Sequence, residues 1–210
     1  MTNPLPVPAL LVITDPPPSP RTIEYVIQEA LGAGCRWVMY REKTASAERF
    51  RSRAIYLAEC CEANDAVLCI NGDIGVAQAC GARGVHLQSA DNVKMAREAL
   101  LPHALIGVSC HSIEDALRAE SSGADYVTLS PIFETASKPG YGPALGVAGL
   151  EEAAKEVSIP LIALAGISTA NAVDCIQHGA HGVAVMGGVM RAIDVGAEVK
   201  GLTSAINLMP

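Results

Sequence analysis

The sequence predicts a single (β/α)₈ barrel, the TIM-barrel fold, spanning residues 1–210. Eight short apolar runs have the length of strands, and helical segments alternate with them. The runs are apolar throughout, which is typical of a parallel sheet buried on both faces. Eight β–α units in about this length fit a compact barrel. A doubly wound open sheet is the alternative, but the count of eight and the lack of G-x-G-x-x-G after the first run favour the barrel.

The eight predicted strands are defined by their apolar runs, which lie at 9–14, 36–40, 66–71, 85–87, 104–109, 126–129, 160–166 and 183–186. Four of them follow a related phrase, which reads Gly32-Ala33-Gly34-Cys35, Gly81-Ala82-Arg83-Gly84, Gly123-Ala124-Asp125-Tyr126 and Gly179-Ala180-His181-Gly182. A glycine just past a helix end supplies a left-handed cap. Each copy of the phrase therefore predicts the end of a helix followed by a buried strand.

Helices are predicted between these strands, at 21–31, 46–63, 92–100, 112–122, 146–157 and 168–178. Ser19 before Pro20 has the pattern of a cap residue followed by proline at the first helical position, so it predicts the start of the first helix. Ser112, with Asp115 three residues later, predicts the cap of another helix. No linker or low-complexity segment indicates a second domain.

Composition excludes several classes of partner. Half of the residues are apolar, yet no run approaches the ~20 residues of a membrane span. The net charge is −7 and no basic stripe interrupts it, so we expect neither a nucleic-acid nor a membrane partner. Seven scattered cysteines without a C-x-x-C pair predict reduced core thiols in a cytoplasmic protein. The N-terminus lacks the pattern of a signal peptide.

Polar and glycine residues follow most of the predicted strands, and in a barrel the carboxyl ends of the strands carry the site. Gly166, Gly187 and Gly188 follow the seventh and eighth strands. Backbone N–H groups in such turns often bind phosphate, so these glycines are predicted phosphate-binding residues. The alternative is that they only make tight turns.

Two other segments predict the binding of an anion. Arg41 and Lys43 follow the second strand, and two cations on the rim of an acidic protein can attract an anionic substrate. A solvated charge cluster is the alternative. The long connection at 130–146 offers Thr135, Ser137 and Lys138 for phosphate, and its glycines and prolines suit a mobile lid.

His111 is the predicted proton-transfer residue. It comes two residues after Ser109, so both side chains point the same way if the strand continues. An unperturbed imidazole titrates near ~6.5 and can give or take a proton at neutral pH. A capping or surface histidine is the alternative, although Ser112 can take the cap. His86, within the fourth strand, is interpreted as a core residue.

Six stretches together resemble the thiamine phosphate synthase/TenI family over residues 10–190: "YREK", "CINGD", "GARGVHL", "GVSCHS", "GADYVTLSPIFETASK" and "GVAVMGG". The resemblance implies a (β/α)₈ barrel that acts on a phosphorylated thiazole in thiamine biosynthesis. It also implies a cytoplasmic enzyme that forms a homo-oligomer, expected to be a dimer.

The resemblance assigns contacts to both halves of a two-substrate site. The positions that match contacts to a pyrimidine pyrophosphate are Arg41, Lys43, Asn71, Ser109 and Lys138. Those that match contacts to the thiazole phosphate are Thr135, Ser137 and Gly166.

The chain departs from the synthase pattern at two positions. Synthases of this family hold Mg²⁺ with an aspartate after the asparagine of strand three and another after strand four. Here Gly72 occupies the first position and Asp91 the second, while Asp73 comes one residue late. Met39 stands where synthases carry a glutamine that grips the pyrimidine.

These departures favour the TenI branch, whose members are thiazole tautomerases. The prediction is therefore an isomerase that forms the aromatic thiazole carboxylate phosphate, with His111 as acid–base group and without a cofactor. A thiamine phosphate synthase that uses Mg²⁺ at an altered site, including Asp91, is the second interpretation. A non-catalytic ligand-binding or regulatory member of the family is the third.

Overall fold

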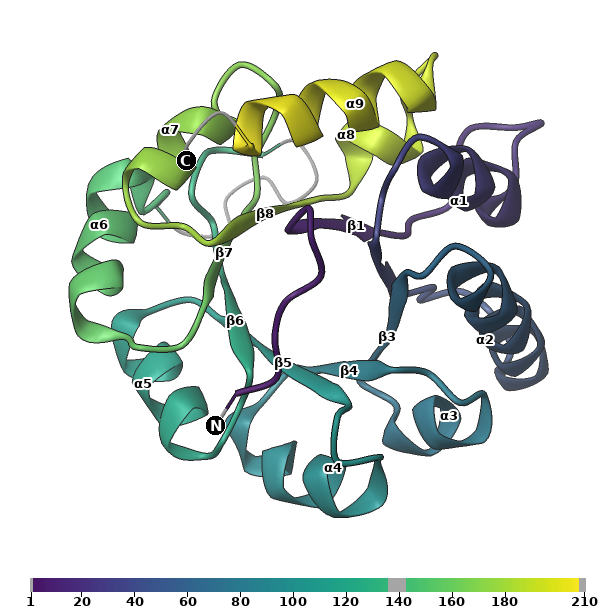
Figure 1. The fold of residues 1–210 in the computed structure, drawn as a ribbon, viewed down its shortest axis with the longest axis horizontal. Helices are drawn as coiled ribbons and strands as arrows, with labels where there is room; N and C mark the ends of the chain where they lie inside the picture. Colours follow the sequence, from purple (N-terminus) through teal and green to yellow (C-terminus); the bar gives the residue numbers. More distant parts are fainter. Residues whose placement is uncertain (1, 136–142, 208–210) are drawn as a thin grey trace.

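The computed structural model describes residues 2–135 and 143–207. Its strands form a closed parallel barrel in the order of the sequence (Figure 1). They are β1 (Leu10–Ile13), β2 (Trp37–Tyr40), β3 (Val67–Asn71), β4 (Gly84–Leu87), β5 (Leu105–Cys110), β6 (Tyr126–Leu129), β7 (Leu161–Leu164) and β8 (Gly182–Val185). The prediction of a (β/α)₈ barrel is confirmed, because β1 pairs with both β2 and β8 and so closes the sheet.

Helices surround the barrel on its outer face (Figure 1). They are α1 (Ile23–Gly32), α2 (Ala47–Glu62), α3 (Ile74–Ala79), the 3₁₀ helix η1 (Ala90–Asn92), α4 (Val93–Ala99), α5 (Ile113–Ser121), α6 (Gly146–Glu156), α7 (Ala172–Gln177), α8 (Gly187–Met190) and α9 (Val195–Ile206). The sequence analysis did not predict α3, α8 or α9, of which α3 and α8 are too short for a periodic pattern. No helix in the described ranges has the length and apolar character needed to cross a membrane.

The helix caps correct one prediction and confirm another. Thr22, not Ser19, caps α1, and its hydroxyl accepts a hydrogen bond from the Tyr25 N–H. Ser19 lies in the preceding turn, and the helix begins at Ile23. Ser112 caps α5 as predicted, accepting from the Asp115 N–H at 3.1 Å. The glycines predicted to follow helix ends have positive φ at Gly34, Gly81, Gly123 and Gly179.

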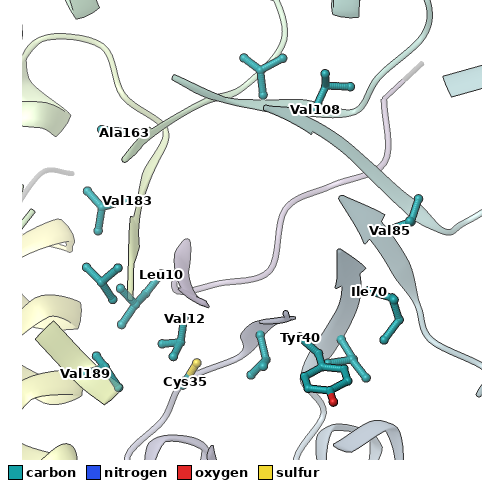
Figure 2. Close-up of a cluster of buried hydrophobic side chains, with 14 of the residues drawn as sticks. Leu10, Val12, Cys35, Tyr40, Ile70, Val85, Val108, Ala163, Val183 and Val189 are labelled. Atoms are coloured by element: carbon teal, nitrogen blue, oxygen red, sulfur yellow. The ribbon is translucent and has the colours of Figure 1, made fainter. Parts of the chain in front are cut away.

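Two apolar layers explain why the strands are apolar throughout. Alternate residues of each strand point to opposite faces of the sheet. One set packs against the helices, and Figure 2 shows part of this layer, including Val12, Tyr40 and Val85. The other set fills the barrel interior, where Trp37 contacts Tyr126 edge to face with ring centroids 4.7 Å apart.

The amino-terminal segment closes one end of the barrel. It crosses the opening in Figure 1, and Leu5 packs against the interior residues. The Asn3 backbone N–H donates to the buried carboxylate of Asp125 at 2.8 Å, and its amide donates to the Ala104 carbonyl at 3.0 Å. Since Asp125 and Ala104 precede β6 and β5, this is the end where the strands begin. The opposite end is left for a site.

Candidate active site at the carboxyl ends of the strands

A cavity of about 1540 Å³ lies at the carboxyl end of the barrel. Nine of the predicted site residues line it: Arg41, Lys43, Asn71, Ser109, His111, Thr135, Gly166, Gly187 and Gly188. Ser137, Lys138 and the rest of the 136–142 stretch of the predicted lid lie outside the described residues. The structure thus brings together groups from β2, β3, β5, β7 and β8 that are far apart in the sequence.

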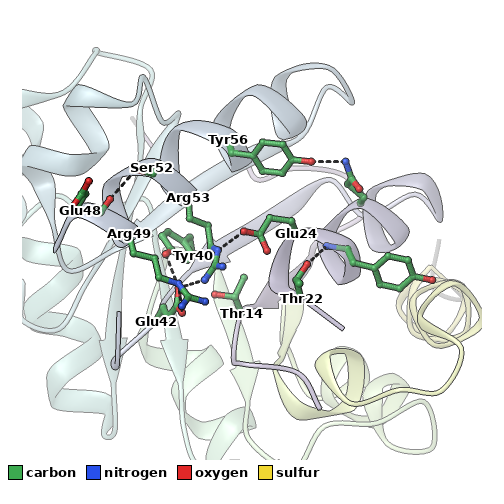
Figure 3. A network of polar contacts seen from close by, with 12 residues as sticks. Thr14, Thr22, Glu24, Tyr40, Glu42, Glu48, Arg49, Ser52, Arg53 and Tyr56 are labelled. Carbon is green, nitrogen blue, oxygen red and sulfur yellow. Dashed lines mark hydrogen bonds and ion pairs between the residues drawn. The ribbon is translucent and has the colours of Figure 1, made fainter. Parts of the chain in front are cut away.

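The charged triplet after β2 divides between two faces. Arg41 and Lys43 line the cavity, whereas Glu42 points to the helices and pairs with Arg53 of α2 (Figure 3). Glu42 also accepts a hydrogen bond from the Tyr40 hydroxyl at 2.9 Å. The simple alternative of a solvated charge cluster therefore fails, because the anion is buried with a partner and the two cations face the cavity.

Thr14 fixes the backbone from which the Arg41 side chain extends. Its buried hydroxyl accepts from the Arg41 N–H and donates to the Arg41 carbonyl, both at 2.8 Å. This paired hydrogen bond ties the end of β1 to the end of β2. It therefore gives Arg41 a rigid base at the rim, which reduces the entropy lost when the side chain binds a ligand.

Asp15, Arg41 and Arg191 form what we call the Asp15 cluster. The Asp15 carboxylate lies 3.8 Å from Arg41 Nη1 and 3.1 Å from Arg191 Nη1. All three side chains line the cavity. Arg191 was not predicted from the sequence, because it lies at the end of α8 and not at the end of the strand β8. Its spacing of four residues from Gly187 was the available signal.

A buried hydrogen-bond chain supports Ser109. His86 Nε2 lies 2.9 Å from the Ser109 hydroxyl, and His86 Nδ1 lies 3.0 Å from the Tyr126 hydroxyl. Tyr126 in turn lies over Gly107, where a Cβ would come within 2.0 Å of its ring. Burial lowers the pKa of His86 to about 3, so its ring is neutral at physiological pH. The interpretation of His86 as a core residue is confirmed, although its ring also reaches the cavity floor.

His111 is held at the rim by two elements. Its Nδ1 lies 2.8 Å from the Ser130 carbonyl at the end of β6, and its backbone N–H donates to Asp115 at 3.1 Å. A carbonyl only accepts hydrogen bonds, so this contact places a proton on Nδ1. The Ser130 hydroxyl lies 3.3 Å from the same nitrogen. The imidazole is therefore oriented by the end of β6, and its backbone is held by α5.

The turn after β7 is shaped by a close backbone contact. Ala165 and Gly166 both have positive φ, at 80° and 68°. A Cβ at position 166 would lie 2.6 Å from the Glu134 carbonyl oxygen, so the connection after β6 requires a glycine there. Glycine at 166 thus has a structural role in a tight turn, and it lines the cavity as well.

The described residues do not build a metal site from carboxylates. They contain no group of three or more His, Cys, Asp or Glu side chains arranged to hold a metal ion. Gly72 supplies no ligand, and Asp73 instead caps α3 by accepting from the Val76 N–H at 2.8 Å. Asp91 accepts from the Ser89 hydroxyl at 2.8 Å and lines a separate hollow beside α4 and the end of α5. Mg²⁺ therefore does not fit a protein-only site here.

Comparison with known proteins identifies the family. The family described as "Thiamine monophosphate synthase" matches residues 10–189. The chain belongs to the thiamine monophosphate synthase family. Thiamine-phosphate synthase from Chloroflexus aurantiacus is 36% identical over 95% of this chain and 93% of its own. The synthase from Methanoculleus marisnigri is 40% identical, with 89% of each chain covered. Among solved structures, thiamine phosphate pyrophosphorylase from Pyrococcus furiosus has a TM-score of 0.83 and 31% identity, covering 94% of both chains.

These relatives overturn the prediction of a thiazole tautomerase. Near full-length relatives at 36–40% identity are named for the synthase, a transferase, and not for an isomerase. The prediction gave too much weight to the two departures at Gly72 and Met39. The first removes one possible metal ligand and the second one possible substrate contact, and neither shows which reaction the site serves. The relatives give no support to the TenI branch in particular, and the role of His111 in proton transfer stays an untested prediction.

Proposed function

We propose that this chain is a thiamine-phosphate synthase, a transferase that joins a pyrimidine pyrophosphate to a thiazole phosphate and releases pyrophosphate. The observation that carries the proposal is a single cavity with cationic side chains after β2 and glycine turns after β7 and β8. The names of the near full-length relatives support the same activity. The predicted homo-oligomer and cytoplasmic location stay predictions.

The cations after β2 suit the pyrophosphate half of the reaction. Negative charge concentrates on the pyrophosphate oxygens as this group leaves, and preorganised positive groups stabilise that charge in the transition state. Arg41 and Lys43 both face the cavity, and the paired hydrogen bond with Thr14 fixes the Arg41 backbone before substrate binds. In this proposal Arg41 holds the leaving group, with Lys43 beside it. Lys138 enters only through the family pattern.

The wall formed by the turns after β7 and β8 suits the thiazole phosphate. Gly166, Gly187 and Gly188 lie at the ends of neighbouring strands, where a barrel commonly binds phosphate. Thr135, in the connection after β6, lines the same cavity. Ser137 is included among the phosphate-binding residues only because it matches the family pattern. The two phosphate-bearing groups would then lie on different walls of one cavity, which leaves the two rings to meet between them.

The floor of the cavity supplies polar groups for orientation. Ser109 is held by the neutral ring of His86, and Asn71 ends β3 beside it. His111 is fixed through Nδ1 to β6. We propose that these groups position the substrates by hydrogen bonding. The expectation of no cofactor belonged to the tautomerase prediction and is not supported. Mg²⁺ would need substrate phosphates among its ligands, because the described residues offer no group of three or more protein ligands, and no step is assigned to it.

The experiment is a direct assay with both substrates. Purified protein is mixed with the pyrimidine pyrophosphate and the thiazole phosphate in buffer containing Mg²⁺, and thiamine phosphate and pyrophosphate are measured over time. We expect the two products in equal amounts, at a turnover on the order of 1 s⁻¹ or more. Omitting either substrate is the control. A preparation that is folded, binds both substrates and forms no thiamine phosphate would exclude the proposed function.

A further inference from the structure

Arg191 is poorly explained as a residue that serves stability. Its side chain is 45% exposed, and its ion pair with Asp15 is partly exposed as well. Exposed ion pairs contribute little to stability, because water screens them and holding a long side chain costs entropy. The contact nevertheless fixes a guanidinium at the rim of the cavity, where solvent and ligand can both reach it.

The position of the guanidinium depends on the turn after β8. A Cβ at Gly187 would lie 1.9 Å from Arg191 Nη2 and 2.7 Å from Cζ. The absence of a side chain at 187 therefore lets the planar group lie directly against the backbone of the turn. Gly187 and Gly188 belong to the wall proposed for the thiazole phosphate, so the guanidinium lies beside that wall.

The Asp15 cluster carries an excess of positive charge. One carboxylate faces two guanidinium groups, at 3.8 and 3.1 Å. Among the described residues that line the cavity, Arg41, Lys43 and Arg191 are cationic, and Asp15 and Glu134 are anionic. A net positive lining in a chain of net charge −7 favours an anionic ligand. A guanidinium also has five N–H donors in a fork that matches phosphate oxygens, and Asp15 accepts from one of them here.

We propose that Arg191 is a substrate-binding residue that contacts the phosphate of the thiazole substrate, with Asp15 anchoring its guanidinium beside Gly187. This inference rests on the proposed function for the identity of the substrate, but the binding of phosphate itself does not. Asp15 then stands between the two cations, with Arg41 on the pyrophosphate side and Arg191 on the monophosphate side. Arg191 is accordingly expected to determine the affinity for the monophosphate and to affect the pyrophosphate much less.

The test uses inorganic phosphate as the probe, so that turnover is not required. Its dissociation constant is measured by calorimetry for the wild type, Arg191→Met, Arg191→Lys and Arg118→Met. Arg118 is the matched control, because it is an exposed arginine that pairs with Glu114 on α5 and does not line the cavity. We expect Arg191→Met to weaken phosphate binding about 10-fold or more, which is the usual value of a hydrogen bond to a charged group. The dissociation constant of Arg191→Lys should lie between those of the wild type and Arg191→Met, because lysine keeps the charge but loses the forked set of N–H donors.

Kinetics and stability complete the test. In the synthase assay, Arg191→Met should raise KM for the thiazole phosphate by a similar factor, with KM for the pyrimidine pyrophosphate changed less than threefold. The unfolding midpoint of Arg191→Met should equal that of the control Arg118→Met. Phosphate binding that is unchanged or tighter in Arg191→Met would overturn the inference, because the guanidinium would then be inert or would itself block the site. If no synthase activity is found but phosphate binding depends on Arg191, the proposed function fails and the assignment of Arg191 to phosphate binding stands without the identity of the substrate.

Discussion

Two arginine clusters at the edge of the barrel differ in burial and in their balance of charges. In the Asp15 cluster, two guanidinium groups share one carboxylate at the rim of the cavity. In what we call the Arg53 cluster, the guanidinium of Arg53 lies between the carboxylates of Glu24 and Glu42, and the more exposed Arg49 lies 3.7 Å from Glu42 (Figure 3). Arg53 is 10% exposed and Glu42 is 5% exposed, whereas Arg191 is 45% exposed. Burial and the ratio of charges thus distinguish a cluster that is paired within the fold from the cluster that we propose binds a ligand.

The charges of the Arg53 cluster are paired within the fold, although Glu24 Oε2 is buried without a hydrogen-bond partner. Arg53 donates to Glu24 at 2.6 Å and also to Glu42, which accepts from Tyr40 as well. Burial raises the pKa of Glu24. Hydrogen bonds from its own backbone N–H and from Arg53 lower the pKa by a larger total amount, so the net shift is downward. The cluster thus joins α1, α2 and the end of β2 without offering a charge to a ligand.

Removing the shared cation should have the largest effect. Arg53→Met keeps much of the side-chain volume but leaves two carboxylates close together with little solvent. Breaking a buried ion pair from one side costs about 3–5 kcal/mol, so we expect the free energy of unfolding to fall by about that amount. Urea denaturation measures it. Phosphate binding should be unchanged in the folded fraction, and a loss below about 1 kcal/mol would show that the cluster is screened as the Asp15 cluster is.

The equivalent change on the cavity side should affect catalysis and not stability. Arg41→Met removes the guanidinium proposed to hold the leaving pyrophosphate. We expect kcat/KM in the synthase assay to fall about 100-fold, the usual scale for losing one preorganised group that stabilises developing charge. The urea midpoint should shift little, because the ion pair between Arg41 and the partly exposed Asp15 is long, at 3.8 Å, and therefore weak. Equal losses of stability in Arg41→Met and Arg53→Met would contradict the distinction between the clusters.

Lowering the pH should reduce the stability of the fold, and His86 and Glu24 should contribute to this loss in different pH ranges. The pKa of His86 is about 3 in the folded chain, against an ordinary value of 6.5. The unfolded chain therefore binds a proton below pH 6.5 that the folded chain refuses, and stability falls as pH falls from 6.5 toward 3. Between pH 7 and 5 the expected loss is about 2 kcal/mol. Glu24 adds to the loss only below its ordinary value of 4.5, because its folded pKa is lowered.

The measurement for this prediction is the slope of the unfolding free energy against pH. His86→Gln should flatten the slope between pH 7 and 5, whatever its effect on overall stability, and Arg53→Met should leave the slope in that range intact. If the wild type is equally stable at pH 7 and pH 5, the ring of His86 is not kept neutral by burial.

The smallest effect is expected for an ion pair in open solvent. Lys155 and Glu151 lie 3.0 Å apart, four residues apart on α6, and both are more than half exposed. Lys155→Met should not change the urea midpoint measurably, because water screens the pair. A shift comparable to that of Arg53→Met would mean that the presence of an ion pair, and not its burial, determines the effect.

The fold was predictable because it depends on a repeated pattern. Eight apolar runs alternate with helices, and glycines such as Gly81 and Gly179 end helices with positive φ whatever the detailed packing. The six-residue helix α3 was missed because so short a segment shows no full period. Thr22 was missed as a cap because Ser19 before Pro20 offered a stronger local pattern.

Most of the cavity was predictable for the same reason, since residues at the ends of parallel strands meet at one edge. Arg191 was missed because it reaches the cavity by folding back over a glycine, and this path depends on the structure of α8. The reaction was predicted wrongly because it was inferred from a missing carboxylate at Gly72. A missing carboxylate at position 72 weakens the binding of a metal ion, but the cationic side chains that line the cavity can also stabilise a negatively charged substrate.

Gly187 and Arg191 should therefore behave as an evolutionary pair. The guanidinium lies where a side chain at 187 would begin, so an arginine at 191 can take this position only when 187 is glycine. Because the guanidinium is the flexible end of its chain, a larger residue at 187 would displace it from Asp15 without unfolding the barrel. Among relatives, we expect sequences with a residue larger than glycine at position 187 to have a shorter or uncharged residue at position 191.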